Sequence, residues 1–148
     1  MAFCLTLKYG ADLGKISLPM RSEGLKLNQV KLLLDNLPAA MQSQRQTLAQ
    51  CFEAMDRALP LRAVYLFGSH ARGEARTDSD VDLCIIADGA ERQSEAARQW
   101  RRAMRPVWPR PAFTLLPISP SRLAEKQASR DHFFQTVFKE GVLLATEN

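Results

Sequence analysis

The sequence LFGSHARGEARTDSDVDLCII, residues 66–86, decides the fold. An apolar run ends there at Gly68-Ser69, a polar loop follows, and a second apolar run opens with Asp80 and Asp82 on either side of a valine. Because side chains of a strand alternate between its faces, we expect the two carboxylates to project on one side. Two like charges held that close repel, and a bound cation offsets the repulsion. Carboxylate oxygens are ligands that Mg²⁺ prefers when phosphates complete its shell.

The Gly68-Ser69 turn is suited to an anion. Gly68 has no side chain, so backbone N–H groups there can approach a ligand closely. If Ser69 begins a helix, its hydroxyl and the free N–H groups of the first turn form an anion site. Phosphates would then lie between this turn and a metal ion held by Asp80 and Asp82.

The flanking sequence predicts alternating strands and helices. Short β-branched and aromatic runs bounded by Gly, Pro and Asp indicate strands, and apolar residues at intervals of three and four indicate helices. This alternation is typical of an α/β or α+β domain in which helices flank a small mixed sheet with three central strands. The strands are predicted at 62–67, 81–87, 112–118 and 142–145, with another within 2–8, and the helices at 25–37, 39–59, 90–104 and 121–140.

Length and composition point to one folded domain. The chain has 148 residues, of which 46% are hydrophobic and 24% charged, enough for an ordinary core. We expect an N-terminal extension at 1–40 and the domain at 41–148. No apolar stretch approaches the roughly 20 residues that span a bilayer, and the N-terminus has no basic leader, so we expect a cytoplasmic protein without a membrane span. The three cysteines form no metal-binding pattern and are expected to be reduced.

The Gly68-Ser69 and Asp80-x-Asp82 pair resembles the signature of nucleotidyltransferases of the DNA polymerase β type, which is Gly-Ser, about ten residues, and Asp-x-Asp. Here ten residues, 70–79, separate the two parts. The surrounding ARGEA and SDVDL are similar to the minimal nucleotidyltransferases, which are often encoded beside a helical HEPN-domain protein as a toxin–antitoxin pair. The resemblance covers roughly 41–145 and implies a nucleotidyltransferase fold.

The resemblance also implies a reaction. An acceptor hydroxyl attacks the α-phosphate of ATP or another nucleoside triphosphate in a Mg²⁺-dependent step that releases pyrophosphate. Asp80 and Asp82 are then the catalytic residues and bind one or two metal ions. The nucleotide-binding residues implied are Gly68 and Ser69, which hold the β and γ phosphates, Arg72, which could reach the triphosphate, and Arg76, a weaker candidate.

One position departs from the family pattern. The third carboxylate of the family lies on the strand after the next helix, and counting back from Ser119-Pro120 as the start of the following helix places that position at Thr114. A threonine hydroxyl supplies neither the charge of a metal ligand nor a base for the nucleophile's proton. Asp88 shares the strand face of Asp82, but six residues at ~3.3 Å each separate them, so it cannot substitute.

Several functions remain open at this point. The resemblance favours an antitoxin that transfers a nucleoside monophosphate, AMP in the first instance, to a hydroxyl of a HEPN-domain toxin. The alternatives are transfer to a small molecule such as an aminoglycoside, and a degenerate domain that only binds nucleotide or its partner. A partner protein or a second copy in a homodimer could complete the acceptor side of the site.

The excess of arginine over lysine, 14 to 6, suits a ligand that carries phosphates, although genomic base composition produces the same bias. Basic side chains gather on the helix predicted at 90–104, where a solvated face is favoured over nucleic-acid binding because no aromatic platform is interleaved with them. Trp108 follows in a proline-rich loop and could be exposed at a contact. The arginines concerned are Arg92, Arg98, Arg101, Arg102 and Arg105.

Overall fold

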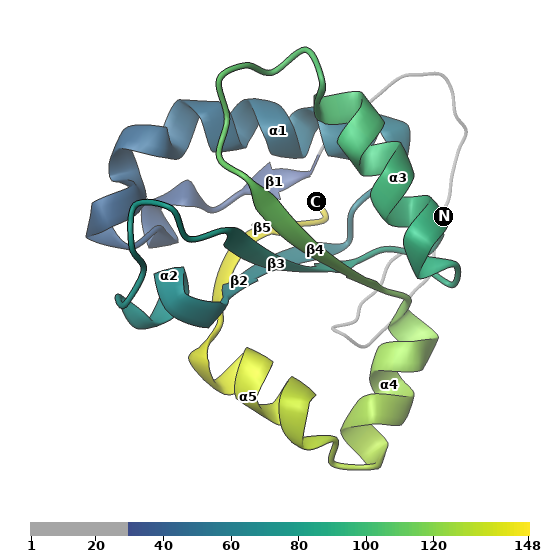
Figure 1. Ribbon diagram of the computed structural model, residues 1–148. Helices are drawn as coiled ribbons and strands as arrows, with labels where there is room; N and C mark the ends of the chain where they lie inside the picture. The colour runs from purple at the N-terminus through teal and green to yellow at the C-terminus, as the bar shows by residue number, and fades with distance from the viewer. Residues whose placement is uncertain (1–29) are drawn as a thin grey trace.

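The computed structural model describes residues 30–148, which form a five-stranded mixed sheet between two layers of helices (Figure 1). The strand order is β1-β5-β2-β3-β4, and the β3–β4 pair is parallel while the other neighbours are antiparallel. The predicted mixed sheet flanked by helices is confirmed, with two more strands beside its central three. The strand predicted within 2–8 lies outside the described residues.

Four of the five strands lie where the sequence pattern predicts them. In chain order the strands are β1 (Lys31–Leu32), β2 (Ala63–Phe67), β3 (Val81–Ile86), β4 (Phe113–Ile118) and β5 (Val142–Thr146). The α-helices are α1 (Arg45–Ala58), α2 (Gly68–Arg72), α3 (Gln93–Met104), α4 (Pro120–Ala128) and α5 (His132–Glu140). Two 3₁₀ segments, Leu34–Asn36 and Ala39–Gln44, precede α1.

The alternation of side chains divides the core between the two faces of the sheet. Val81, Leu83 and Ile85 of β3 belong to the cluster that α1 and α3 cover, with Phe52 and Trp100 fully buried in it. Cys84 and Ile86 belong to a second cluster under α4 and α5. Figure 1 shows the first helix pair above the sheet and the second pair below it. Asp82, by the same alternation, lies on the face of α4 and α5.

The N-terminal helix predicted at 25–37 is wrong for its described part. Residues 31–32 form β1, which pairs antiparallel with β5, and Leu34–Asn36 is a single 3₁₀ turn. The leucine spacing that suggested a helix arises because Leu34 and Leu37 both enter the core from a tight turn. The next helix is also shorter than predicted, since 39–44 is 3₁₀ and α1 begins at Arg45.

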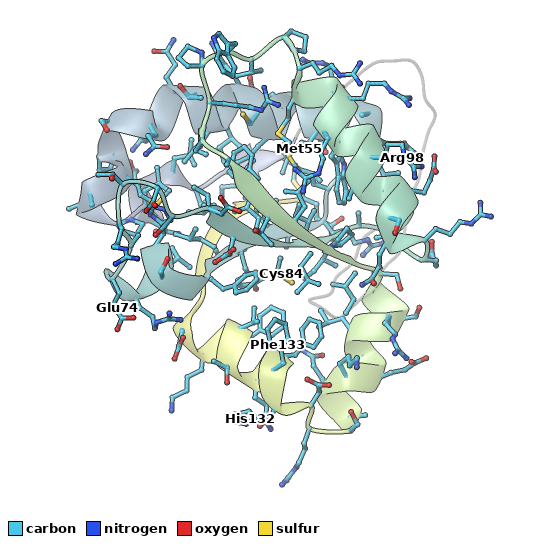
Figure 2. All side chains as sticks on the ribbon, in the orientation of Figure 1. Met55, Glu74, Cys84, Arg98, His132 and Phe133 are labelled. Carbon is cyan, nitrogen blue, oxygen red and sulfur yellow. The ribbon has the colours of Figure 1, made fainter. Side chains whose placement is uncertain are left out.

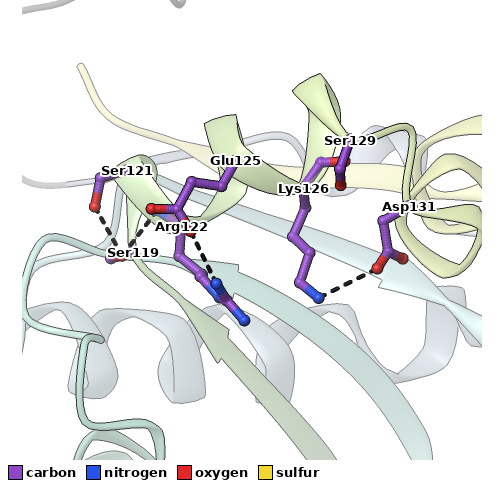
Figure 3. A network of polar contacts seen from close by, with 7 residues as sticks. All are labelled: Ser119, Ser121, Arg122, Glu125, Lys126, Ser129 and Asp131. Carbon is purple, nitrogen blue, oxygen red and sulfur yellow. Dashed lines mark hydrogen bonds and ion pairs between the residues drawn. The ribbon is translucent and has the colours of Figure 1, made fainter.

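The helix predicted at 121–140 is two helices, α4 and α5. The chain turns at Arg130, whose φ is +57°, and Asp131 then caps α5 by accepting a hydrogen bond from the Phe134 N–H at 3.2 Å. Lys126 Nζ lies 3.2 Å from Asp131 Oδ2 and ties the two helices together (Figure 3). At the other end of α4, Ser119 accepts from the Arg122 N–H. A new N-cap inside an apolar pattern therefore divides one periodic segment.

Two further findings concern membrane helices and cysteines in the part of the chain that the structure describes. Within residues 30–148, no helix has the length and apolar character needed to cross a membrane. Cys51 and Cys84 are free thiols buried in the core, and burial raises the pKa of Cys51 to about 11 and that of Cys84 to about 12. Both thiols are therefore protonated at neutral pH and behave as apolar core residues.

Candidate functional site

Asp80, Asp82 and Thr114 meet where β3 and β4 begin. The parallel register pairs Asp82 with Thr114, and the Thr114 hydroxyl donates a hydrogen bond to Oδ2 of Asp80 at 3.1 Å. Sequence reasoning placed both carboxylates on one side of β3 and Thr114 at the third position, and the structure brings all three together. Asp88 lies beyond the other end of β3, where its carboxylate is 3.0 Å from Arg62 Nε.

The Gly68 backbone packs directly against Asp82. Gly68 follows β2 and begins α2 in the left-handed region, with φ +77°, and a Cβ placed on it would collide with Asp82 Oδ2. Phe67, the residue before it, pairs with Asp82 across the antiparallel ladder. Glycine is therefore needed at position 68 for two reasons. It leaves room for the Asp82 carboxylate, and it can adopt a backbone conformation that other residues rarely adopt.

The environment of Asp82 disfavours its ionised form. Burial raises the pKa of the half-buried Asp82 carboxyl above its ordinary value, the Thr114 hydroxyl lowers it, and the negative charge of Asp80 raises it further. His70 and Arg72 lower it by smaller amounts. The Thr114 hydroxyl therefore lies between the two carboxylates, donating to Asp80 and partly offsetting the effect of burial on Asp82.

This shift predicts how stability depends on pH. The folded state holds the Asp82 proton more tightly than the unfolded chain does, so ionisation costs stability as pH rises through the unfolded and then the folded pKa. The cost is absent below the unfolded pKa and complete above the folded one. We expect Asp82→Asn to stabilise the protein at neutral pH relative to the parent, with a smaller advantage near pH 3.5. Urea unfolding at both pH values measures this, and an advantage that grows toward low pH would contradict the assignment.

Helix α2 carries Ser69 and Arg72, two of the remaining candidate residues. Ser69 lies in its first turn, and the next residue, His70, has Nε2 3.2 Å from the Ser79 carbonyl oxygen, which requires a proton on Nε2. His70 thus ties α2 to the loop before Asp80. Arg76 is exposed in that loop, and its backbone N–H donates to Ser79 Oγ.

Arg72 is held by two carboxylates. Its guanidinium lies 2.9 Å from Glu74 and 3.5 Å from Glu140, and these contacts raise its pKa. Glu140 ends α5, far along the sequence, and no local signal indicated that it would meet Arg72. Arg72 is close enough for its charge to act on Asp82, but a phosphate would have to compete with both glutamates for it.

Phe133, whose place on the apolar face of the last helix predicts burial, is partly exposed and adjoins the site through Phe67. Phe133 is 48% exposed, and its ring meets those of Phe67 and Phe134 edge-on, with centroids 5.9 and 5.3 Å away. Figure 2 places Phe133 in the layer between α5 and the sheet, on the side of Cys84. Phe67 is the ladder partner of Asp82, so Phe133 lies one side chain away from the carboxylates.

The donor set fits a metal ion only if a ligand completes it. Among residues 30–148 no group of three or more His, Cys, Asp or Glu side chains is placed to hold a metal. Mg²⁺, however, is commonly held by one or two carboxylates together with substrate phosphates and waters. Asp80 and Asp82 match that arrangement, and a cation bound between them would offset the repulsion of the two carboxylates.

Comparison with known families identifies the domain. The family model for the nucleotidyltransferase domain matches residues 48–129, which is more than half of the chain and contains the turn, both aspartates and Thr114. The chain belongs to this nucleotidyltransferase family. The match supports nucleotidyl transfer as the general chemistry of this nucleotidyltransferase domain. It does not identify the acceptor, the base of the nucleotide or the partner.

A solved structure is also similar. It is a crystal structure from Sulfolobus solfataricus, assigned as a nucleotidyltransferase, with 22% identity and a TM-score of 0.43 over 60% of this chain and 80% of that one. A search of curated proteins gave no significant match. The identification of the nucleotidyltransferase domain therefore rests on the family match.

Proposed function

We propose that this nucleotidyltransferase domain transfers AMP from Mg–ATP to a hydroxyl group of a HEPN-domain partner protein and so acts as the antitoxin of a toxin–antitoxin pair. The observation that carries the transfer is the meeting of Asp80 and Asp82 with the Gly68 turn. The resemblance of ARGEA and SDVDL to the minimal nucleotidyltransferases supports the partner class and the choice of AMP.

Each residue has a physical role in this proposal. Asp80 and Asp82 would hold the magnesium, which when bound neutralises phosphate charge and orients the reacting oxygens. Gly68 lets the backbone approach the β and γ phosphates, and the Ser69 hydroxyl donates to them. Thr114 positions Asp80 through its hydrogen bond. Arg72 can add a positive charge if phosphate displaces one of its glutamates.

The direct test is a mass measurement. The reading frames beside the gene are searched for a small all-helical HEPN-domain protein, which the proposal expects there. The full chain is incubated with Mg²⁺, ATP and this protein, and the partner is analysed by intact mass spectrometry. A gain of one nucleotide mass on the partner, dependent on Mg²⁺, is the expected result. Replacing ATP in turn by each other nucleoside triphosphate gives the base preference. No mass gain with any of them, despite nucleotide binding, would refute transfer to this acceptor.

Thr114 favours a second candidate, a domain that binds Mg–nucleotide and its partner without turnover. The hydroxyl is neutral and already donates to Asp80, so it cannot accept the nucleophile's proton as a carboxylate would. Nucleotide binding measured by calorimetry without any product in the mass assay would distinguish this candidate from the enzyme.

A substitution at Thr114 separates the two candidates further. We expect Thr114→Asp to raise the transfer rate about 10- to 100-fold, the usual range for gaining or losing one ligand-supporting group. It should also lower the melting temperature without metal, because a third negative charge joins two that already repel. Thr114→Asn is the control of equal size and no charge. Equal rates for the Asp, Asn and parent proteins would show that position 114 does not limit the reaction.

A further inference from the structure

Two large apolar side chains are exposed among residues 30–148. One is Phe133, described above, and the other is Trp108, which is 80% exposed. It lies in the loop between α3 and β4, at the top of Figure 1 and at the opposite end of the molecule from α4 and α5. The other tryptophan, Trp100, is fully buried and donates from Nε1 to the Leu59 carbonyl. A tryptophan in solvent gains little of the stabilisation that burial of its large apolar surface would give. Packing of the core therefore does not explain a tryptophan at position 108.

The loop holds Trp108 in place rather than leaving it loose. Val107, just before it, is half-buried against the core, and its N–H donates to the Met104 carbonyl at 2.9 Å. Arg110, two residues after it, donates from its guanidinium to the Val107 carbonyl at 3.0 Å. Prolines at 106, 109 and 111 restrict the backbone further. The backbone that carries the exposed indole is therefore restrained, which lowers part of the entropy cost of binding a ligand there.

The sequence around Trp108 is rich in arginine and contains no acidic residue. Residues 96–124 contain six arginines and no aspartate or glutamate. Arg102 and Arg105 are exposed, and within 30–148 the structure gives neither guanidinium a hydrogen bond or an ion pair. Lone arginines at the end of a helix are also favoured by the helix dipole, but the dipole does not account for an exposed indole beside them.

The loop that carries Trp108 ends next to the candidate site in the chain. Arg101 donates to the Phe113 carbonyl at 3.3 and 3.4 Å, and Thr114 is the next residue. The loop ends at Ala112, whose carbonyl accepts from the Val81 N–H, between the two aspartates. The loop that carries Trp108 therefore leads into the strand that carries Thr114.

We infer that Trp108, Arg102 and Arg105 form a binding surface for a single-stranded nucleic acid, with a base stacked on the indole and phosphates paired with the two guanidiniums. Every base has a π face and every nucleotide a phosphate, so this combination binds single strands with little sequence preference. An acidic protein would match the arginines but would offer the exposed indole no base to stack on it. The surface goes beyond the proposed transfer reaction and needs neither ATP nor Mg²⁺.

The experiment measures binding of fluorescein-labelled 20-nucleotide U and dT strands to the full chain by anisotropy, without nucleotide or Mg²⁺. We expect Trp108→Ala to weaken binding roughly 5- to 150-fold and Trp108→Phe to restore most of it. Arg102→Ser with Arg105→Ser should weaken binding and reduce the dependence on salt by roughly one to two phosphate contacts. The control, Arg122→Ser with Arg130→Ser on and after α4, removes the same charge at the far end and should bind like the parent.

Tryptophan fluorescence gives a second readout. Because Trp100 is buried, quenching by an unlabelled strand should come from Trp108 and vanish in Trp108→Ala. The tighter of the two strands, U or dT, identifies the ligand as RNA or DNA, and either supports the surface. Three results would overturn it. The first is equal affinity of the parent for a duplex and for a single strand, and the second is an equal loss of strand binding in the Arg122→Ser, Arg130→Ser control. The third is displacement of the strand by polyglutamate, together with strand binding by Trp108→Ala that equals the parent's. The last would assign the surface to an acidic protein.

Discussion

We expect nucleotide transfer to fall by at least about 10²-fold when Asp80 and Asp82 are both replaced by asparagine, because the variant keeps the shape of the site but loses the charge that would hold the metal. We expect the double substitution not to lower the stability of the folded state. The two carboxylates repel, and burial already raises the pKa of Asp82, so removing both charges relieves a cost. The measurement pairs transfer of labelled AMP with the melting temperature, taken with and without Mg²⁺. Stabilisation by Mg²⁺ and ATP should disappear with the activity.

Asp78→Asn is the matched control for this experiment. Asp78 is exposed in the same loop, two residues before Asp80, and its loss removes one negative charge near the site. We expect it to retain both transfer and stabilisation by Mg²⁺ and ATP. Equal label transfer by the parent and the double asparagine variant would remove these aspartates from the mechanism.

The second large effect is expected at Gly68. Gly68→Ala places a Cβ where Asp82 Oδ2 lies and forces a left-handed backbone on alanine. The backbone conformation costs about 1–2 kcal/mol, and relief of the collision requires a shift that costs about 1–3 kcal/mol more. Transfer should be lost together with this stability, because the shift displaces Asp82 itself. Chemical unfolding and the transfer assay, run on the same preparation, measure both.

Gly73→Ala separates the two contributions. Gly73 has φ +74°, nearly that of Gly68, but a Cβ there meets nothing within 4 Å. This variant should therefore show only the backbone cost of about 1–2 kcal/mol and keep its transfer activity at temperatures where it is folded. If Gly68→Ala proves as active as Gly73→Ala, close packing of the turn against Asp82 is unimportant for function.

Local patterns were sufficient for most of the sheet. The strands around the site were predictable because each is a short apolar run with a turn residue at its end, such as Gly68 after β2. Helix α5 was not predicted as a separate element, since the left-handed turn at Arg130 and the cap at Asp131 leave the apolar periodicity on both sides intact. Likewise, the leucines near residue 34 have helical spacing although the chain forms a strand and a turn.

The site was predictable as far as strand geometry determines it. Alternation put Asp80 and Asp82 on one face, and counting back from a helix start put Thr114 beside them. The hydrogen bond from Thr114 to Asp80, the contact of Gly68 with Asp82 and the pairing of Arg72 with Glu140 depend on how distant segments pack. No spacing along the chain encodes such contacts, and only the three-dimensional structure shows them.

The two-residue strand β1 has a practical consequence. It supplies the backbone partners for the outer side of β5, which would otherwise be a bare edge next to the central strands. A shortened chain that starts at residue 41 would leave those amides and carbonyls available to any extended segment, including one from a neighbouring molecule, and would also empty the core positions of Val30, Leu34 and Leu37. Truncations intended for crystallisation should retain the chain from Val30 onward, since self-association through that edge would mask the true oligomeric state.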